Sequence, residues 1–172
     1  YGKHTFDNRF YFGSEANGAG ARVDIFGDTT FAAPLYVAGT KLGILATVAV
    51  NGGISNWNSS ATARHVTITT GNAKGRVDVN APISVAHQLG VNASHTGNAG
   101  FNMKVYLNCA GNRFRNYMPI AGGELICTVP DAYPADAYFG GQEPQYSKTT
   151  EGGRLDVGGY DATLDYHADT GS

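Results

Sequence analysis

The chain has 172 residues, most simply a single domain, and 42% of them are hydrophobic, which is enough to build a core. Only 15% are charged, well below the ~25% of an ordinary soluble domain, and the formal net charge is −2. A pI of about 6.2 without a basic cluster argues against nucleic-acid binding. A surface of small neutral polar residues is typical of extracellular proteins that form assemblies. The start at Tyr1, with neither Met nor an apolar leader, leads us to expect a processed, secreted chain.

Alternation of apolar and polar residues recurs along the whole sequence, whereas helical periodicity is nearly absent. Clusters rich in Gly, Asn and Ser separate the alternating segments and resemble turns. This pattern predicts an all-β protein, an antiparallel β-sandwich or jelly roll with an N-terminal extension strand. No internal repeat is apparent. The expected strands are 5–12, 22–26, 34–38, 42–50, 62–69, 76–80, 83–91, 101–109, 124–129 and 160–168.

The N-terminal segment is unusual because three phenylalanines, Phe6, Phe10 and Phe12, share one face of its expected strand. A Gly- and Ala-rich stretch of the kind found in flexible linkers follows it. Such a tethered apolar strand has the features of a donor strand that adds to the sheet of a neighbouring subunit. The alternative is that residues 5–12 pair within their own domain as an edge strand. The expected division is therefore 1–12 extension strand, 13–21 linker and 22–172 β-sandwich domain.

The longest apolar stretch, residues 42–50, is about half as long as a membrane-spanning helix, so we expect a buried strand and no membrane insertion. The two cysteines, Cys109 and Cys127, both fall on the apolar side of expected strands. Their even number permits one bridge, and we predict a disulfide between them, with two buried thiols as the alternative.

Enzymatic motifs are missing from the sequence, which contains no G-x-S-x-G, no P-loop and no H-E-x-x-H. Asp161 and Asp165 would lie ~13 Å apart on one strand, too far to act as the paired carboxyls of a glycosidase. We therefore predict that the protein is not an enzyme.

The segment YDATLDYHAD, residues 160–169, places Asp161, Asp165, His167 and Asp169 on one face of an expected strand. Asp165, His167 and Asp169 form a candidate metal site. Carboxylates without soft ligands favour Ca²⁺ over a transition metal, so calcium is the cofactor to consider. A solvated strand face, without any ion, is the simpler interpretation.

Charge is distributed unevenly along the chain. Residues 1–130 hold ten Lys and Arg against six Asp and Glu, whereas residues 131–172 hold two against eight. An acidic end and a basic body favour head-to-tail contacts between copies, with Asp161, Asp165 and Asp169 among the contact residues. Together with the apolar strand, this predicts a structural subunit of an extracellular self-assembling appendage, such as a pilus-like filament, a sheath or a coat.

The alternative function is an extracellular carbohydrate-binding or adhesin domain that recognises host or surface glycans. Trp57, the only tryptophan, lies among Asn, Ser and Gly, where an aromatic ring beside amide groups suits stacking on a sugar. Tyr138 and Tyr146 populate a second loop with the same potential.

Overall fold

The computed structural model describes residues 2–13, 22–38, 40–56, 66–69, 75–85, 89–92, 103–114, 120–121, 123–134 and 154–156. In this part of the chain every strand pairing is parallel. The strands form three sheets, and the chain visits the sheets in turn before returning to the first. The fold is a parallel β-helix, a solenoid in which each of the four coils from β1 to β12 contributes one strand to each sheet, and successive coils rest on one another.

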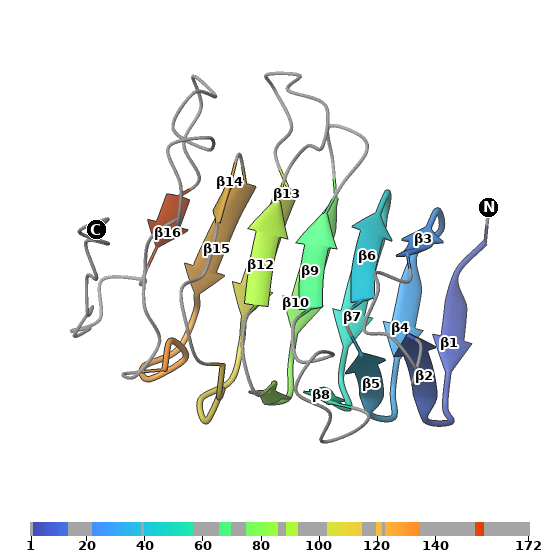
Figure 1. Cartoon of the computed structure of the whole chain (residues 1–172), viewed down its shortest axis with the longest axis horizontal. Coiled ribbons are helices and arrows are strands. Elements are labelled where there is room, and N and C mark those ends of the chain that lie inside the picture. Colours follow the sequence, from blue (N-terminus) through green and yellow to red (C-terminus); the bar gives the residue numbers. More distant parts are fainter. Residues whose placement is uncertain are drawn as a thin grey trace, which may run out of the picture.

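The first sheet, sheet A, runs along the long axis of the molecule from the N-terminal coil to the last described strand (Figure 1). Its strands in spatial order are β1 (His4–Phe6), β4 (Thr29–Phe31), β7 (Thr47–Val50), β10 (Arg76–Val79), β13 (Met103–Leu107), β15 (Gly123–Cys127) and β16 (Arg154–Asp156).

Two shorter sheets complete the described coils. Sheet B contains β2 (Phe10–Gly13), β5 (Leu35–Ala38), β8 (Ile54–Asn56) and β11 (Ile83–Ser84). Sheet C contains β3 (Arg22–Ile25), β6 (Thr40–Ile44), β9 (Val66–Thr69), β12 (Leu89–Asn92) and β14 (Ile120–Ala121).

The expected antiparallel sandwich is therefore wrong, although most of the expected strands exist. Alternation shows which face of a strand is buried, but it does not show the direction of the neighbouring strand. Residues 51–53, in one of the expected turn clusters, form a corner between β7 and β8 and not a hairpin, because these two strands belong to different sheets. The stretch 42–50 illustrates the difference, because β6 ends at Ile44, the chain bends at Leu45 and Ala46, and β7 begins in another sheet.

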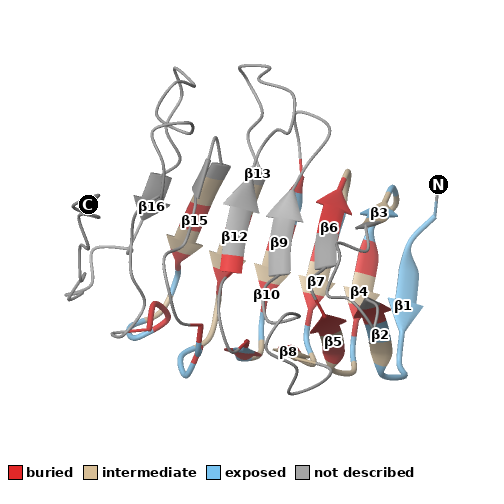
Figure 2. Ribbon diagram, in the orientation of Figure 1, coloured by how far each residue is buried: buried red, intermediate tan, exposed pale blue. Residues whose placement is uncertain are grey.

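The core consists of aliphatic columns that run along the solenoid axis. In sheet A, Val48 pairs with Val77, Val77 with Val105 and Val105 with Leu125, and all four side chains are buried. Figure 2 shows buried stretches of strand along the length of the molecule. Residues 48, 77, 105 and 125 mark coils of 29, 28 and 20 residues. Each such side chain contributes ~1.5–3 kcal/mol through burial, so every coil depends on its neighbours for much of its stability.

One buried polar residue, Asn112, joins three coils near the end of the core. Its Oδ1 accepts a hydrogen bond from the amide of Ile83 at 2.9 Å. Its Nδ2 donates to the carbonyl oxygens of Cys109 and Ala132, both at 2.8 Å. Because buried polar groups are stable only when hydrogen-bonded, Asn112 fixes the path of the chain at this corner.

The expected disulfide between Cys109 and Cys127 is also wrong, because the structure contains two thiols there. Cys127 is buried in β15 and pairs with Leu107, whereas Cys109 lies beyond the end of β13. The Cys109 Sγ instead donates to the Oδ1 of Asn112 at 3.8 Å. Burial raises the pKa of the Cys109 thiol. The alternation that placed both sulfurs on one side of their strands does not extend past Leu107, where the coil turns.

We predict that unreduced protein, denatured and treated with iodoacetamide, gains two alkyl groups. Native protein should react at Cys109 only at a higher pH than a peptide cysteine, because burial disfavours the thiolate, which is the reactive form. Intact-mass measurement decides the first point and labelling rates at several pH values the second. A chain that gains alkyl groups only after reduction would contradict the structure.

A second prediction concerns Gly53, which has a φ of +82°. A Cβ built at this residue would lie 2.6 Å from the carbonyl oxygen of Pro82 in the next coil. We expect Gly53→Ala to lower the free energy of unfolding by more than ~1 kcal/mol in urea titration. Gly2→Ala is the matched control, because a Cβ at Gly2 meets nothing within 4 Å. If both variants unfolded at the same urea concentration, the close contact between Gly53 and Pro82 of the next coil would be contradicted.

Candidate assembly interface at the N-terminal coil

The N-terminal coil consists of β1, β2 and β3, which are the terminal strands of sheets A, B and C. β1 pairs in parallel with β4, and β2 pairs in parallel with β5. The sequence left two placements open for residues 5–12, addition to a neighbouring subunit or pairing within their own domain. In the structure these residues pair within their own chain. The stretch is two strands of different sheets, separated by a bend at Asn8.

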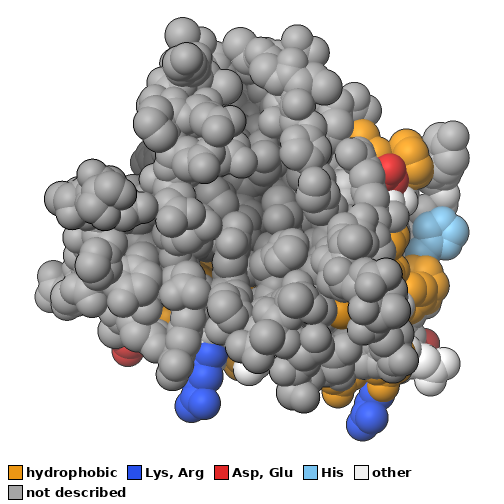
Figure 3. All heavy atoms as spheres, in the orientation of Figure 1, with side chains coloured by type: hydrophobic (Ala, Val, Ile, Leu, Met, Phe, Trp, Pro, Cys, Tyr) orange, Lys and Arg blue, Asp and Glu red, His pale blue; other side chains and the backbone are white. Residues whose placement is uncertain are grey.

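The three phenylalanines of this segment lie at the end of the core and contact one another. The ring centroids of Phe6 and Phe10 are 4.9 Å apart, and those of Phe10 and Phe12 are 4.6 Å apart. Phe12 is buried and Phe10 half-buried, but Phe6 is 38% exposed. The apolar interior thus comes to the surface at this end, where Figure 3 shows hydrophobic side chains gathered on the side that carries β1.

Two pairs of stacked rings connect this coil to the next one. The ring of Phe6 stacks on that of Phe31 in the next coil, with centroids 5.4 Å apart and an interplanar angle of 15°. On the outside of sheet B, Tyr11 stacks on Tyr36 at 4.9 Å and 12°. Tyr11 is 48% exposed, and Phe26 nearby in the chain is 60% exposed. These exposed rings have apolar surface that a further layer of residues would cover.

In the part of the chain that the structure describes, β1 has a neighbouring strand on one edge of its backbone and an open edge on the other. The amide of His4 donates to the carbonyl of Asp28 at 2.9 Å, and the carbonyl of Phe6 accepts from the amide of Ala32 at 3.0 Å. The backbone N–H and C=O groups of residues 4 and 6 therefore point toward β4. Because this direction alternates along a strand, the same groups of Lys3, Thr5 and Asp7 point away from β4. Within the described part of the chain, no strand of sheet A lies on that side. Such an edge is a template for pairing with another strand.

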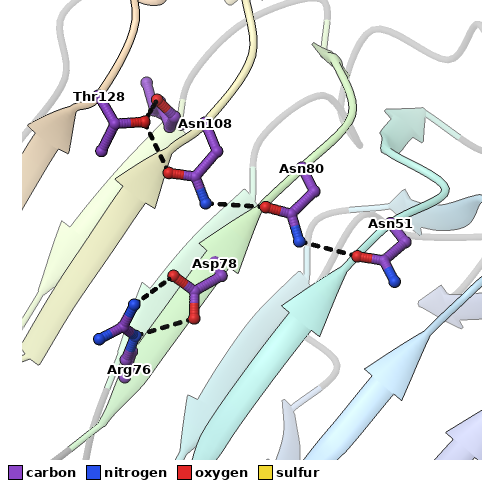
Figure 4. Close-up of polar contacts among 7 residues, drawn as sticks. Asn51, Arg76, Asp78, Asn80, Asn108 and Thr128 are labelled. Atoms are coloured by element: carbon purple, nitrogen blue, oxygen red, sulfur yellow. Dashed lines mark hydrogen bonds and ion pairs between the residues drawn. The ribbon is translucent and has the colours of Figure 1, made fainter.

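A polar ladder on the outside of sheet A holds the later coils in register (Figure 4). Thr128 Oγ1 donates to Asn108 Oδ1 at 2.7 Å, Asn108 Nδ2 to Asn80 Oδ1 at 2.8 Å, and Asn80 Nδ2 to Asn51 Oδ1 at 2.8 Å. Each of these residues directly follows a strand of sheet A. The ladder stops at Asn51 because the equivalent position of the preceding coil is Ala32, whose amide pairs with Phe6.

Charged residues on the same outer face also form ion pairs, one within strand β10 and one between β13 and β15. The Arg76 guanidinium donates two hydrogen bonds of 2.8 Å to Asp78, which raises the pKa of Arg76, and it lies 4.3 Å from the centroid of the Tyr106 ring. Lys104 Nζ lies 3.3 Å from Glu124 Oε2. Exposed pairs of this kind contribute little, ~0.2–1 kcal/mol each.

The ladder and the solenoid were not predicted from the sequence, although the sequence contains a signal for both. The segments TVAVN at 47–51, RVDVN at 76–80 and KVYLN at 104–108 share a valine in the second position, an aliphatic residue in the fourth and a terminal asparagine. They recur at intervals of a single coil. A short repeat that ends in the same polar residue indicates stacked coils, since identical side chains then lie above one another.

The remaining predicted site residues, Asp161, Asp165, His167, Asp169, Trp57, Tyr138 and Tyr146, lie outside the described residues. Among the residues that are described, no group of three His, Cys, Asp or Glu side chains is placed to hold a metal ion. In the same part of the chain, no helix has the length and hydropathy that crossing a membrane requires. No protein-family model, curated protein or solved structure matches this chain.

We predict that Asn80→Ala destabilises the protein more than Asn51→Ala does. Asn80 both donates and accepts a hydrogen bond in the ladder, whereas Asn51 accepts one from Asn80. With ~1 kcal/mol for each hydrogen bond, the expected losses are roughly 2 and 1 kcal/mol in urea titration. The ladder would have no role in stability if both variants unfolded at the wild-type midpoint.

Proposed function

We propose that this chain is a structural subunit of an extracellular self-assembling appendage, such as a filament, a sheath or a coat, and that copies of it join by strand addition. The observation that carries the proposal is the open edge of β1, which lies beside apolar rings at the end of the core. An edge strand with backbone groups directed outward and exposed aromatic residues next to it has both components of a strand-addition interface.

The solenoid architecture supports this proposal because it grows in one dimension. Each coil is stabilised by contacts with its neighbours, so a further coil from another copy adds the same contacts at the end. The main-chain hydrogen bonds would continue in sheet A, and the exposed surface of the Phe6 and Tyr11 rings would become buried. The role proposed earlier for the N-terminal strand thus changes: residues 4–6 stay in their own chain and offer an edge to the neighbour.

Charge complementarity supplies a second contact in this proposal. The acidic surplus of residues 131–172 would bind the basic surplus of residues 1–130 in another copy. Such contacts between exposed charges weaken as salt is added, whereas strand addition depends on hydrogen bonds and apolar burial and is less sensitive to salt. Assembly with a salt-sensitive and a salt-resistant component would fit this combination.

A non-catalytic, extracellular role fits the composition, which is low in charge and lacks the enzymatic motifs considered above. The carbohydrate-binding alternative depends on Trp57, Tyr138 and Tyr146, which lie outside the described residues. The described surface therefore adds no geometry in its favour, and assembly is the function that the structure supports better.

Thr5→Pro is expected to block assembly without unfolding the protein. Proline removes the Thr5 N–H, which faces the open edge, and the hydrogen bonds of His4 and Phe6 to the next coil remain. Electron microscopy and light scattering of wild type and variant measure assembly, and circular dichroism checks the fold. His4→Pro is the matched control, since it removes an amide bonded to Asp28 and should lower the melting temperature. Wild-type-like polymers from folded Thr5→Pro protein would exclude strand addition at β1.

A further inference from the structure

We propose that two copies of the chain pair head to head through β1, in antiparallel orientation, with Thr5 opposite Thr5 of the partner subunit. This inference rests on the proposed function and specifies its partner and register. It follows from the backbone directions, the charges and the rings of residues 3–7.

The hydrogen-bonding groups of the open edge determine which registers are possible. Lys3, Thr5 and Asp7 direct their N–H and C=O groups outward, so only odd-numbered residues can form the hydrogen-bonded pairs of an antiparallel ladder. With Thr5 opposite the partner's Thr5, Lys3 falls opposite the partner's Asp7 and Asp7 opposite the partner's Lys3. All three residues then exchange hydrogen bonds. A shift by two residues in either direction leaves one of them without a partner.

The side chains of the same residues are self-complementary in this register. Thr5 pairs with Thr30 in β4. Because the next residue, Phe31, points into the core, the side chain of Thr30 points outward, and so does that of Thr5. By the same alternation, Lys3 and Asp7 also lie on the outer face of sheet A. Lys3 and Asp7 are both exposed. A two-fold axis at Thr5 creates two Lys–Asp pairs from one sequence, as an isologous interface requires.

The inner face gains apolar contacts from the same arrangement. His4 and Phe6 alternate with the outward residues, and His4 falls opposite the partner's Phe6 in the closely spaced, non-hydrogen-bonded positions. Phe6 is 38% exposed and His4 is exposed, so the pairing covers surface that the single chain leaves in water. Cross-strand aromatic pairs are among those that stabilise antiparallel ladders.

A second copy is the occupant that this charge pattern favours, because the edge is complementary to itself. The head-to-tail order expected from the overall charge asymmetry would place a different strand against β1 and would leave the Lys3 and Asp7 pattern unused. A head-to-head pair closes on itself, so longer polymers would need the second, charge-based contact of the acidic C-terminal region.

Charge reversal at the two positions tests the register. In Lys3→Asp, residues 3 and 7 are both acidic, so each self-pair sets carboxylates opposite carboxylates. In Asp7→Lys, both residues are basic, with the same consequence. A one-to-one mixture of the two variants restores both attractive pairs in the heterodimer. We expect each variant alone to dimerise roughly tenfold more weakly than wild type at low salt, and the mixture to recover wild-type affinity.

Sedimentation velocity of the full chain measures these affinities, and circular dichroism melting verifies that both variants fold. Assembly of the wild type without rescue in the mixture would overturn the head-to-head register while leaving strand addition intact. A wild type that stays monomeric at all concentrations would overturn both this inference and the proposed function. Coverage of β1 by another segment would give the same result. Rescue in the mixture, lost in high salt, is the result that the inference predicts.

Discussion

The structure depends on one constraint: no coil of the solenoid can bury its apolar face or satisfy its strand edges alone. The parallel hydrogen bonds of sheet A and the aliphatic columns behind it connect each coil to the coils before and after it. Interior coils therefore have a partner on both sides. A terminal coil has a partner on only one side, and its exposed edge and core must be covered, capped or used.

Among the described residues, the N-terminal coil has a strand edge that no other strand of sheet A covers. Its backbone alternation directs three residues outward, and two of its rings stack on rings of the next coil. The polar ladder from Thr128 to Asn51 does not extend to this end, because Ala32 replaces the asparagine that would continue it. The first coil is thus attached mainly by main-chain hydrogen bonds and aromatic contacts, the same interactions that a neighbouring copy would provide.

The sequence predicted the local structure well and the global structure poorly, for a physical reason. Segments such as 76–80 and 34–38 were recognised as strands because alternation between buried and exposed residues depends only on the strand itself. Strand direction depends on which distant segment lies alongside, and only the recurring Val-x-aliphatic-Asn segments encode that. The predicted disulfide was wrong because Cys109 lies past the end of β13, where the alternation of buried and exposed residues no longer holds. The aromatic character of the N-terminal segment was recognised from the sequence, whereas its pairing partners β4 and β5 were not.

The central claim, that copies join through the open edge of β1, is tested most directly by hydrogen exchange of single amides in the free and assembled protein. The amides of His4 and Phe6 bond to the adjacent coil and should be protected in both states. The amides of Lys3, Thr5 and Asp7 face the open edge and should exchange rapidly in the monomer. The account predicts that these three become protected on assembly. Rapid exchange of all three in fully assembled material would contradict it.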